Sequence, residues 1–451
     1  MNIHLIAIGG SIMHNLALSL KKNGINVTGS DDMIFEPSRS RLKNKNLLPE
    51  ELGWFPNKIH TKLDGVILGM HAQHDNSELK KAQEIGIPIY SYPEYIYNNS
   101  QHKKRIVIGG SHGKTSITSM ILHVFKNCKI DSDYIVGAQI DGFDRMVKLT
   151  DEAKIIVLEG DEYLSSPIDK RPKFHLYKPH IAVLSGIAWD HINVFPTYKN
   201  YVKQFKIFIE DIKDLLIYYE NDTEILKIIK NKTRCDIKGY STPEYEIKGG
   251  ITYLTYNKNL IPLKIFGKHN LQNINAAKLV CNEIGISDKQ FHLAISTFTG
   301  AKKRLELVLK NKYSAVYTDF AHSPSKLKAT TTAMKRQFPE RKLIACLELY
   351  TFSSLTKDFL VEYKNCMNDA DLAIVYFNPN IMKKKQLQML REQDIKKAFG
   401  RQDLNVISEI TNLENYLCKL NWKNQNLVMM SSGDFNCLDI NSLAEKILNT
   451  T

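Results

Sequence analysis

A short glycine-rich turn carries the residues best suited to phosphate chemistry. It follows an apolar run at 105–108 and precedes a helical pattern at 117–125. Its members are Gly110, Ser111, His112, Gly113, Lys114, Thr115 and Ser116. Such a turn aims backbone N–H groups at a polyphosphate, while a lysine neutralises phosphate oxygens and a threonine hydroxyl holds Mg²⁺. The sequence predicts that this turn binds ATP and Mg²⁺, the alternative being a tight turn in which Gly-Lys-Thr occurs by chance.

Two further groups with metal-binding chemistry follow later apolar runs. Glu159 comes directly after the run 155–158, and His191 follows the run 181–184. A carboxylate at the end of a strand beside the turn can face the phosphate loop, so Glu159 is a candidate metal ligand. Carboxylate oxygens suit Mg²⁺, although acids at strand ends are often only solvated and single histidines are often structural.

Three later segments combine polar residues at short, regular spacings. Residues 267–277 read GKHNLQNINAA and contain His269, Asn270 and Asn273. Residues 300–306 contain Arg304, and residues 318–324, TDFAHSP, contain Asp319 and His322. Asparagines at the start of a helix are also typical of helix caps, so each segment alone is only a weak indication of a nucleotide-binding site.

Taken in order, these segments resemble the motifs of the Mur ligase superfamily, which joins amino acids or peptides to UDP-N-acetylmuramate. The turn is the shortened GxxGKT form of the usual GxxxxGK[ST] phosphate loop. The resemblance implies that Mg²⁺ is bound by Thr115, Glu159 and His191. It implies nucleotide contacts from His269, Asn270, Asn273, Arg304, Asp319 and His322. It also assigns catalytic roles to Lys114, His191 and Arg304.

Strand-like and helical patterns alternate along the chain, which is typical of parallel α/β units. With the resemblance, this alternation predicts an α/β protein of three domains. We expect a Rossmann-like UDP-N-acetylmuramate-binding domain at 1–102, a P-loop-type ATP-binding domain at 103–302 and a Rossmann-like C-terminal ligase domain at 303–451. A Tyr- and Lys-rich stretch around 213–265 is expected to form a peripheral sheet.

The N-terminal segment has the plan of a nucleotide-binding unit, a strand, a glycine turn and a helix, followed by a second strand. The residues expected to contact the substrate there are Gly10, Ser11, Ser30, Asp31 and Asn76. The GxGxxG fingerprint is not satisfied, because Ala7, His14 and Asn15 stand where relatives would carry further glycines. Asp31 and Asn76 are also ordinary cap residues by type.

The expected acceptor follows from residues 161–174, DEYLSSPIDKRPKF, which resemble a segment of the murein peptide ligase family. That resemblance implies ATP-dependent joining of L-alanyl-γ-D-glutamyl-meso-diaminopimelate to UDP-N-acetylmuramate through an acyl phosphate, in peptidoglycan recycling. Arg171 is then a candidate anchor for a peptide carboxylate, whereas Tyr350 stands where that family has an arginine. Lys206 is a weaker candidate, as a carbamylated metal ligand.

Three alternatives to this function stay open. The first is a UDP-N-acetylmuramate–L-alanine ligase of primary peptidoglycan synthesis, which would share every ATP motif. The second is a non-catalytic nucleotide-binding scaffold, against which the retention of Glu159, His191, Arg304 and Asp319 argues. The third is a nicotinamide-dependent oxidoreductase, against which the broken glycine fingerprint argues.

Composition narrows the class of protein. The 451 residues carry a formal net charge of +13, yet the lysines are spread along the whole chain, which disfavours a nucleic-acid partner. We find no apolar run of the ~18 residues that a membrane helix needs, and no signal peptide at the start. The seven cysteines lie far apart, without metal-ligand or disulfide patterns. We therefore expect a cytoplasmic enzyme without membrane insertion.

Overall fold

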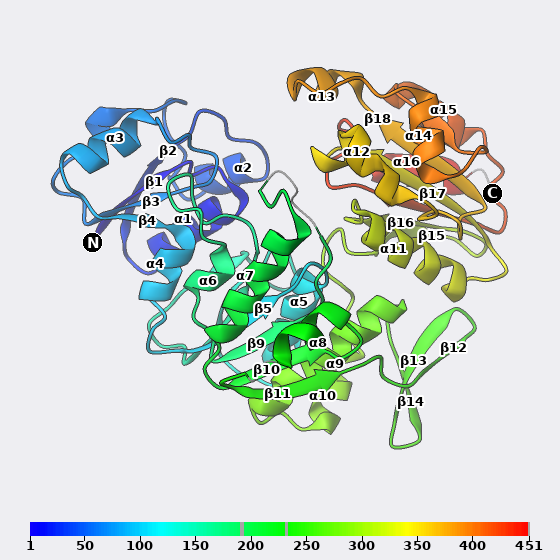
Figure 1. The fold of residues 1–451 in the computed structure, drawn as a ribbon, viewed down its shortest axis with the longest axis horizontal. Coiled ribbons are helices and arrows are strands. Elements are labelled where there is room, and N and C mark those ends of the chain that lie inside the picture. The colour runs from blue at the N-terminus through cyan, green and yellow to red at the C-terminus, as the bar shows by residue number, and fades with distance from the viewer. Residues whose placement is uncertain (190–193, 231–232, 450–451) are drawn as a thin grey trace. The chain divides into compact units, whose positions relative to one another are not determined.

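The computed structural model describes residues 1–189, 194–230 and 233–449 (Figure 1). Its strands form four sheets, of four, seven, three and six strands. Three of the sheets are mainly parallel and alternate with helices along the chain. The predicted α/β class is confirmed.

The N-terminal sheet has the strand order β2-β1-β3-β4, and all its pairings are parallel. Its strand β1 is mostly buried, and α1 packs an apolar stripe of Met13, Leu16, Ala17 and Leu20 inward. This spacing of three and four residues is that of one helix face. The elements are β1 (Asn2–Ile6), α1 (Ser11–Lys22), β2 (Asn26–Ser30), α2 (Ser38–Lys43), β3 (Gly65–Leu68), α3 (Ser77–Glu84), β4 (Ile89–Ser91) and α4 (Tyr92–Asn98).

The seven-stranded sheet has the order β11-β10-β9-β5-β8-β6-β7 and is parallel except for β7. Its central strands are continuous buried apolar runs, as strands covered on both faces are. The strands are β5 (Lys104–Gly109), β6 (Asp133–Ile135), β7 (Val147–Lys148), β8 (Ile155–Glu159), β9 (Ile181–Leu184), β10 (Leu215–Tyr219) and β11 (Asp236–Tyr240). Because β5 lies between β8 and β9, the phosphate-binding turn and Glu159 leave the sheet on neighbouring strands.

Six helices belong to the same part of the sequence. They are α5 (Lys114–Asn127), α6 (Lys173–Leu176), α7 (Tyr198–Glu210), α8 (Thr223–Ile229), α9 (Lys268–Glu283) and α10 (Asp288–Ile295). Helix α7 buries Tyr201, Phe205, Phe208 and Ile209, and Phe174 of α6 stacks on Phe208 at 4.5 Å between ring centroids. This aromatic packing holds α6 and α7 together beside the sheet.

The stretch 213–265 departs in part from the predicted peripheral sheet. Strands β10 and β11 are parallel members of the seven-stranded sheet, because residues 215–217 are apolar and buried. The remaining strands, β12 (Tyr245–Lys248), β13 (Ile251–Tyr256) and β14 (Asn259–Pro262), form a separate antiparallel ribbon (Figure 1). The peripheral sheet is therefore confined to residues 245–262.

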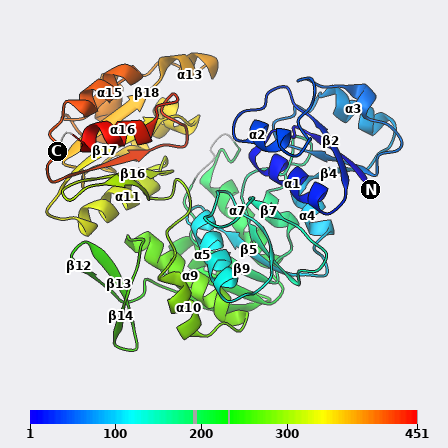
Figure 2. The same ribbon diagram turned by 180° about the vertical axis from the view of Figure 1, so that it is seen from behind.

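The six-stranded sheet has the order β15-β16-β20-β17-β18-β19, with β15 antiparallel to β16. Helices cover both of its faces (Figures 1 and 2), because alternate residues of its strands enter two separate apolar cores. The strands are β15 (Glu306–Lys310), β16 (Ala315–Asp319), β17 (Lys342–Leu349), β18 (Leu372–Phe377), β19 (Asn405–Ile407) and β20 (Gln425–Met430). The helices are α11 (Pro324–Gln337), α12 (Lys357–Leu360), α13 (Pro379–Lys384), α14 (Glu392–Phe399), α15 (Ile410–Cys418) and α16 (Ile440–Leu448).

The chain divides into two compact units. The first comprises Met1–Ile187, Thr197–Ser241 and Ala276–Ala294, and the second Ala188–Pro196, Thr242–Asn275 and Ile295–Thr451. The domain boundaries expected at residues 102 and 302 stay predictions. No helix within the described ranges has both the length and the apolar character that crossing a bilayer demands.

Candidate active site

The phosphate-binding turn joins β5 to α5, as the sequence predicts. Gly110 and Gly113 have φ angles of +119° and +76°, values that favour glycine. A Cβ atom at Gly110 would lie 2.2 Å from the Ser185 Oγ, so no side chain fits there. His112 and Ser116 are half-buried beside this turn. The backbone therefore reaches the start of α5 in the conformation that a phosphate loop needs.

Lys114 is held within the turn by two oxygen atoms. Its ammonium donates to the Gly110 carbonyl at 2.8 Å and pairs with Glu162 at 2.7 Å. The side chains of Lys114 and Glu162 are only 12% and 2% exposed. Burial lowers the pKa of Lys114, but Glu162 and Asp161 outweigh it and leave the pKa raised. Lys114 is therefore charged at neutral pH, and its contact with a phosphate stays a prediction.

Thr115 and Glu159 meet at the end of β8. The Thr115 hydroxyl donates to the Glu159 carboxylate at 2.7 Å, and the Gly137 N–H donates to its other oxygen at 2.6 Å. Both side chains are largely buried. A hydroxyl beside a carboxylate fits Mg²⁺, which binds a few protein oxygens and keeps water or phosphate as its other ligands.

The third predicted metal ligand, His191, lies outside the described residues. Among the residues that the structure does describe, no three His, Cys, Asp or Glu side chains cluster as a metal site. Lys206, the candidate for carbamylation, is exposed on α7. The metal assignment of Thr115 and Glu159 stays a prediction that their geometry fits.

Two residues of this cluster were missed by the sequence analysis. The Tyr201 hydroxyl lies 2.8 Å from the Ser111 Oγ and donates to Glu162 at 3.1 Å. Glu162 thus links Lys114 to a buried tyrosine on α7. The acidic residues within 159–162 indicated that Glu162 could belong to the site. The sequence around Tyr201 gave no indication that this residue contacts Ser111 and Glu162.

A second cluster lies in the other compact unit and brings together residues from three predicted motifs. Asp319 ends β16 and accepts the Leu305 N–H at 3.2 Å and the Thr330 hydroxyl at 2.5 Å. The Arg304 guanidinium lies 4.5 Å from the Phe320 ring centroid. The Phe320 carbonyl oxygen is 2.8 Å from the His322 Nδ1. Arg304, Asp319 and His322 are therefore neighbours, and their contacts with a nucleotide stay predictions.

The start of α9 contributes to the same cluster. Burial lowers the pKa of His269, while nearby Asp319 acts to raise it. Asn270 and Asn273 are largely buried, and the Asn270 amide donates to the Phe266 carbonyl at 2.9 Å. The predicted contact of these three residues with a nucleotide base stays a prediction.

The expected substrate residues of the N-terminal unit gather at the carboxyl ends of β1 and β2. Gly10 immediately precedes α1, and Ser11 is its first residue. Asp31 accepts the Gly9 N–H at 2.7 Å, and burial raises its pKa despite that bond. Ser30 is fully buried, and its hydroxyl has no partner in the structure. Their contact with UDP stays a prediction.

The side chains that replace the expected glycines have structural roles. Ala7 is buried with a φ of +65°, so the backbone keeps a glycine-like conformation. The His14 Nδ1 lies 2.9 Å from the Gly10 carbonyl oxygen, and burial lowers the pKa of His14. The Asn15 Oδ1 accepts the Met146 N–H at 2.9 Å.

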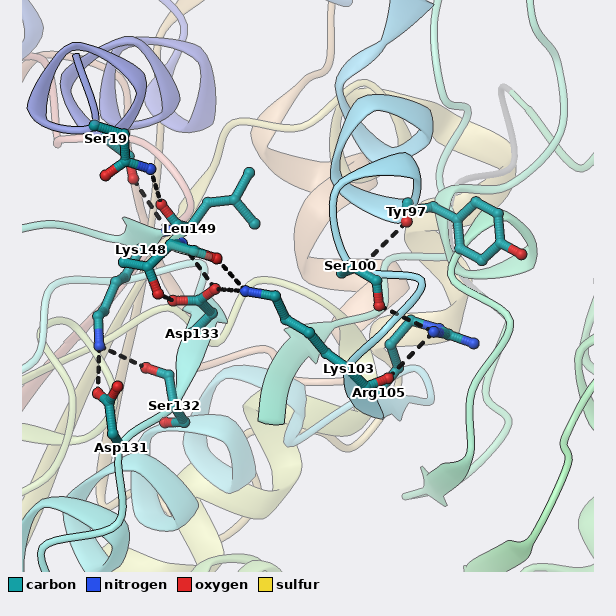
Figure 3. Close-up of polar contacts among 12 residues, drawn as sticks. Ser19, Tyr97, Ser100, Lys103, Arg105, Asp131, Ser132, Asp133, Lys148 and Leu149 are labelled. Atoms are coloured by element: carbon teal, nitrogen blue, oxygen red, sulfur yellow. Dashed lines mark hydrogen bonds and ion pairs between the residues drawn. The ribbon is translucent and has the colours of Figure 1, made fainter. Parts of the chain in front are cut away.

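Helix α1 is docked on β7 through one polar face. One turn after Asn15, the Ser19 hydroxyl accepts the Leu149 N–H at 3.0 Å, and Asn23 donates to the Leu149 carbonyl. Figure 3 shows Ser19 beside Leu149 and, on the other side, Lys103 directed at Asp133. The latter two side chains are fully buried and 2.5 Å apart. The N-terminal sheet is thus fixed to the seven-stranded sheet.

The other expected substrate residues have local partners. Asn76 caps α3 by accepting the N–H groups of Glu78 at 2.9 Å and Leu79 at 3.0 Å. Arg171 is largely exposed and pairs with Asp169 at 2.7 Å. Asn76 thus acts as a helix cap, and Arg171 takes part in a surface ion pair. The substrate roles of both residues stay predictions.

Comparison with protein families gives two adjacent matches. The Mur ligase family catalytic domain matches residues 2–104, and the Mur ligase middle domain matches residues 108–281. Two curated relatives are UDP-N-acetylmuramate–L-alanine ligases. That of Clostridium botulinum is 30% identical over 391 residues, covering 83% of this chain and 82% of the relative. That of Desulforamulus reducens is 28% identical over 389 residues, with the same coverages.

Solved structures have the same fold at low sequence identity. A murein peptide ligase from Psychrobacter arcticus gives a TM-score of 0.69 at 23% identity, covering 100% of this chain and 99% of that one. The UDP-N-acetylmuramate–alanine ligase of Thermotoga maritima gives 0.72 at 17% identity, with the same coverages. A MurF ligase of Thermotoga maritima, in complex with ADP, gives 0.63 at 14% identity, covering 88% and 97%.

Proposed function

The chain belongs to the Mur ligase family, whose members are ATP-dependent amide ligases of peptidoglycan synthesis, and we propose that it joins UDP-N-acetylmuramate to an acceptor amine. The observation that carries this proposal is the cluster at the ends of β5 and β8. There a charged Lys114 lies within a glycine turn, and Thr115 meets Glu159 at 2.7 Å. This pairing of cation and metal-binding oxygens is what phosphoryl transfer from ATP requires.

The proposed reaction has two steps. A carboxylate oxygen of the sugar's lactoyl group attacks the γ-phosphorus, the bond to the β-phosphate oxygen breaks, and ADP leaves. The acceptor amine then attacks the acyl phosphate carbon, loses a proton and expels inorganic phosphate as the amide forms. ATP thus supplies the leaving group that a free carboxylate lacks.

Each group has a proposed role in this scheme. Lys114 and Arg304 neutralise charge that accumulates on the transferred phosphoryl oxygens. Thr115 and Glu159 hold Mg²⁺, which when bound supplies positive charge beside the phosphates. Glu162 and Tyr201 act by position, because Glu162 pairs with Lys114 and accepts the Tyr201 hydroxyl. Asp319 and His322 contact the nucleotide.

L-alanine is the first candidate acceptor. The curated relatives that match more than four-fifths of this chain carry that name, which supports primary peptidoglycan synthesis over recycling. Arg171, the residue considered for a peptide carboxylate, is already paired with Asp169. The expectation of a tripeptide acceptor thus has less support than its alternative.

The tripeptide L-alanyl-γ-D-glutamyl-meso-diaminopimelate is the second candidate. The observation in its favour is the segment 161–174, which forms a defined loop. The N–H and the hydroxyl of Ser165 both donate to the Arg171 carbonyl, at 3.0 and 2.6 Å, and Phe174 anchors the loop in the aromatic core. Because these contacts hold the loop in one conformation, the loop is suited to recognise an acceptor longer than a single amino acid.

The test is phosphate release from ATP and Mg²⁺ with UDP-N-acetylmuramate, with the acceptor varied between free L-alanine and the tripeptide. Mass spectrometry of the product identifies the bond formed. Turnover with L-alanine alone supports the first candidate, and turnover with the tripeptide alone supports the second. An absence of amide product with either acceptor, in enzyme that binds ATP, would overturn the proposed ligase function.

A further inference from the structure

A cavity lies within the compact unit that holds the C-terminal sheet. Its volume is about 360 Å³, within the range of about 300–1,000 Å³ that small-molecule sites occupy. It opens between strand β12, the first turn of α9 and helix α11. Tyr245, Ile247 and Ala333 form the apolar part of its lining. Gln272 and Thr332 add hydrogen-bonding groups. The cavity thus combines the two surfaces that recognise a small polar molecule.

The charge of this cavity is entirely positive. Lys268, Lys328 and Arg336 line it, and no aspartate or glutamate from the described part of the chain does. Within the described ranges none of these three side chains makes an ion pair. Lys335 on the same helix, in contrast, pairs with Asp371 at 2.8 Å. The three positively charged side chains around this cavity repel one another, and an anion bound among them would relieve that repulsion.

The cavity lies on a different face of α9 from Asn270 and Asn273, two of the three proposed nucleotide contacts of this helix. Lys268 and Gln272 are four residues apart and share one face of the helix, whereas Asn270 and Asn273 share another. The Asn270 amide is turned to the Phe266 carbonyl at 2.9 Å. Only His269, which lies between the two faces, is common to the cavity and to the cluster around Asp319.

We propose that this cavity binds a small organic phosphate monoester. A phosphate dianion accepts hydrogen bonds from lysine and arginine, and Arg336 presents the planar fork that matches phosphate oxygens. The organic part lies against Tyr245 and Ile247, with its hydroxyl groups near Gln272 and Thr332. None of the residues that line the cavity belongs to the proposed phosphate loop, and the proposal does not rest on the ligase assignment.

The test is calorimetric titration of the full chain with ribose 5-phosphate, in the presence of saturating ADP and Mg²⁺ so that the phosphate loop is filled. We expect one binding event for ribose 5-phosphate and none for ribose. The double variant K328A/R336A, whose substituted side chains are exposed, is expected to weaken binding at least about tenfold. The affinity of each single variant for ribose 5-phosphate is expected to lie between that of the double variant and that of wild type.

The matched control is K335A, which removes a lysine from the same helix but from outside the cavity. It should bind ribose 5-phosphate as wild type does. An absence of binding to wild type, or equal binding to K328A/R336A, would overturn the proposal. So would a severalfold rise in the KM for ATP in K328A/R336A, because the cavity would then belong to the nucleotide site.

Discussion

Lys114 and Thr115 lie side by side in the chain, and their partners come from one acidic run. Lys114 pairs with Glu162, and Thr115 donates to Glu159. Two carboxylates at and just after the end of β8 thus contact a cation and a hydroxyl of the turn. Fixed charges of this kind contribute most to catalysis when they need little reorganisation, which supports the proposed role of the turn.

The substitution Thr115→Val tests the proposed metal role at this scale. It keeps the size and shape of the side chain but removes the hydroxyl that meets Glu159. We expect the Mg²⁺ concentration for half-maximal ATP turnover to rise about 10–100-fold. The measurement is turnover as a function of Mg²⁺ concentration at fixed ATP.

Thr118→Val is the matched control on the same helix. The Thr118 hydroxyl is buried and has no partner among the residues that the structure describes, so its loss should leave the Mg²⁺ dependence unchanged. Equal Mg²⁺ dependence of T115V and wild type would remove Thr115 from the metal site.

Sequence alone identified the part of this site that is local in the chain. The turn from Gly110 to Thr115 has a fixed spacing, so residue types suffice to predict it. Tyr201 comes from a helix far along the chain, and its contact with Ser111 depends on how α7 packs. Arg171 had a charge suited to anchoring a carboxylate, but its pairing with Asp169 needed the fold to be seen.

At the scale of elements, the polar face of α1 is what joins the first two sheets. Asn15, Ser19 and Asn23 are spaced by four residues, so they form one line along the helix and bind the backbone at 146–149. One position at which a nucleotide-binding turn would carry glycine, that of Asn15, is thus used to dock the helix. Helical periodicity predicted α1, but the partner of its polar face could not be read from the sequence.

The substitution Ser19→Ala tests this docking. It leaves the Leu149 N–H buried without an acceptor, which costs about 1–3 kcal/mol. We expect the free energy of unfolding in urea to fall by that amount. The control is Ser40→Ala, which removes an exposed hydroxyl bonded to Glu36. It should change the free energy of unfolding by less than about 0.5 kcal/mol. Equal effects of the two changes would contradict the docking role.

At the scale of the whole molecule, buried histidines couple stability to pH. Burial lowers the pKa of His14, His175, His180, His269 and His292. The unfolded chain titrates near the ordinary value of about 6.5 and so binds protons before the folded chain does. Their contribution to stability is present above that pH and is lost as the pH falls through the folded-state values.

We therefore expect the Tm to fall as the pH is lowered from about 7.5 to about 6. The measurement is thermal unfolding followed by circular dichroism at fixed ionic strength. A Tm that stays constant or rises over this interval would contradict the assignment of these histidines as buried and neutral.

The division of the whole chain was predicted only in outline. Alternation of strand and helix patterns predicted α/β sheets, and each sheet lies within one of the three expected ranges. The compact units cut across those ranges, because residues 242–275 group with the C-terminal sheet. Such grouping depends on contacts between distant segments, on which local periodicity carries no information.

The central claim is that ATP activates the sugar carboxylate as an acyl phosphate. The most direct measurement uses UDP-N-acetylmuramate labelled with ¹⁸O in its lactoyl carboxylate, followed by mass spectrometry of the phosphate released during turnover. We predict that one carboxylate oxygen is transferred, so that each released phosphate carries a single ¹⁸O at full labelling. Turnover that releases only unlabelled phosphate, or that places the label in AMP, would contradict the claim.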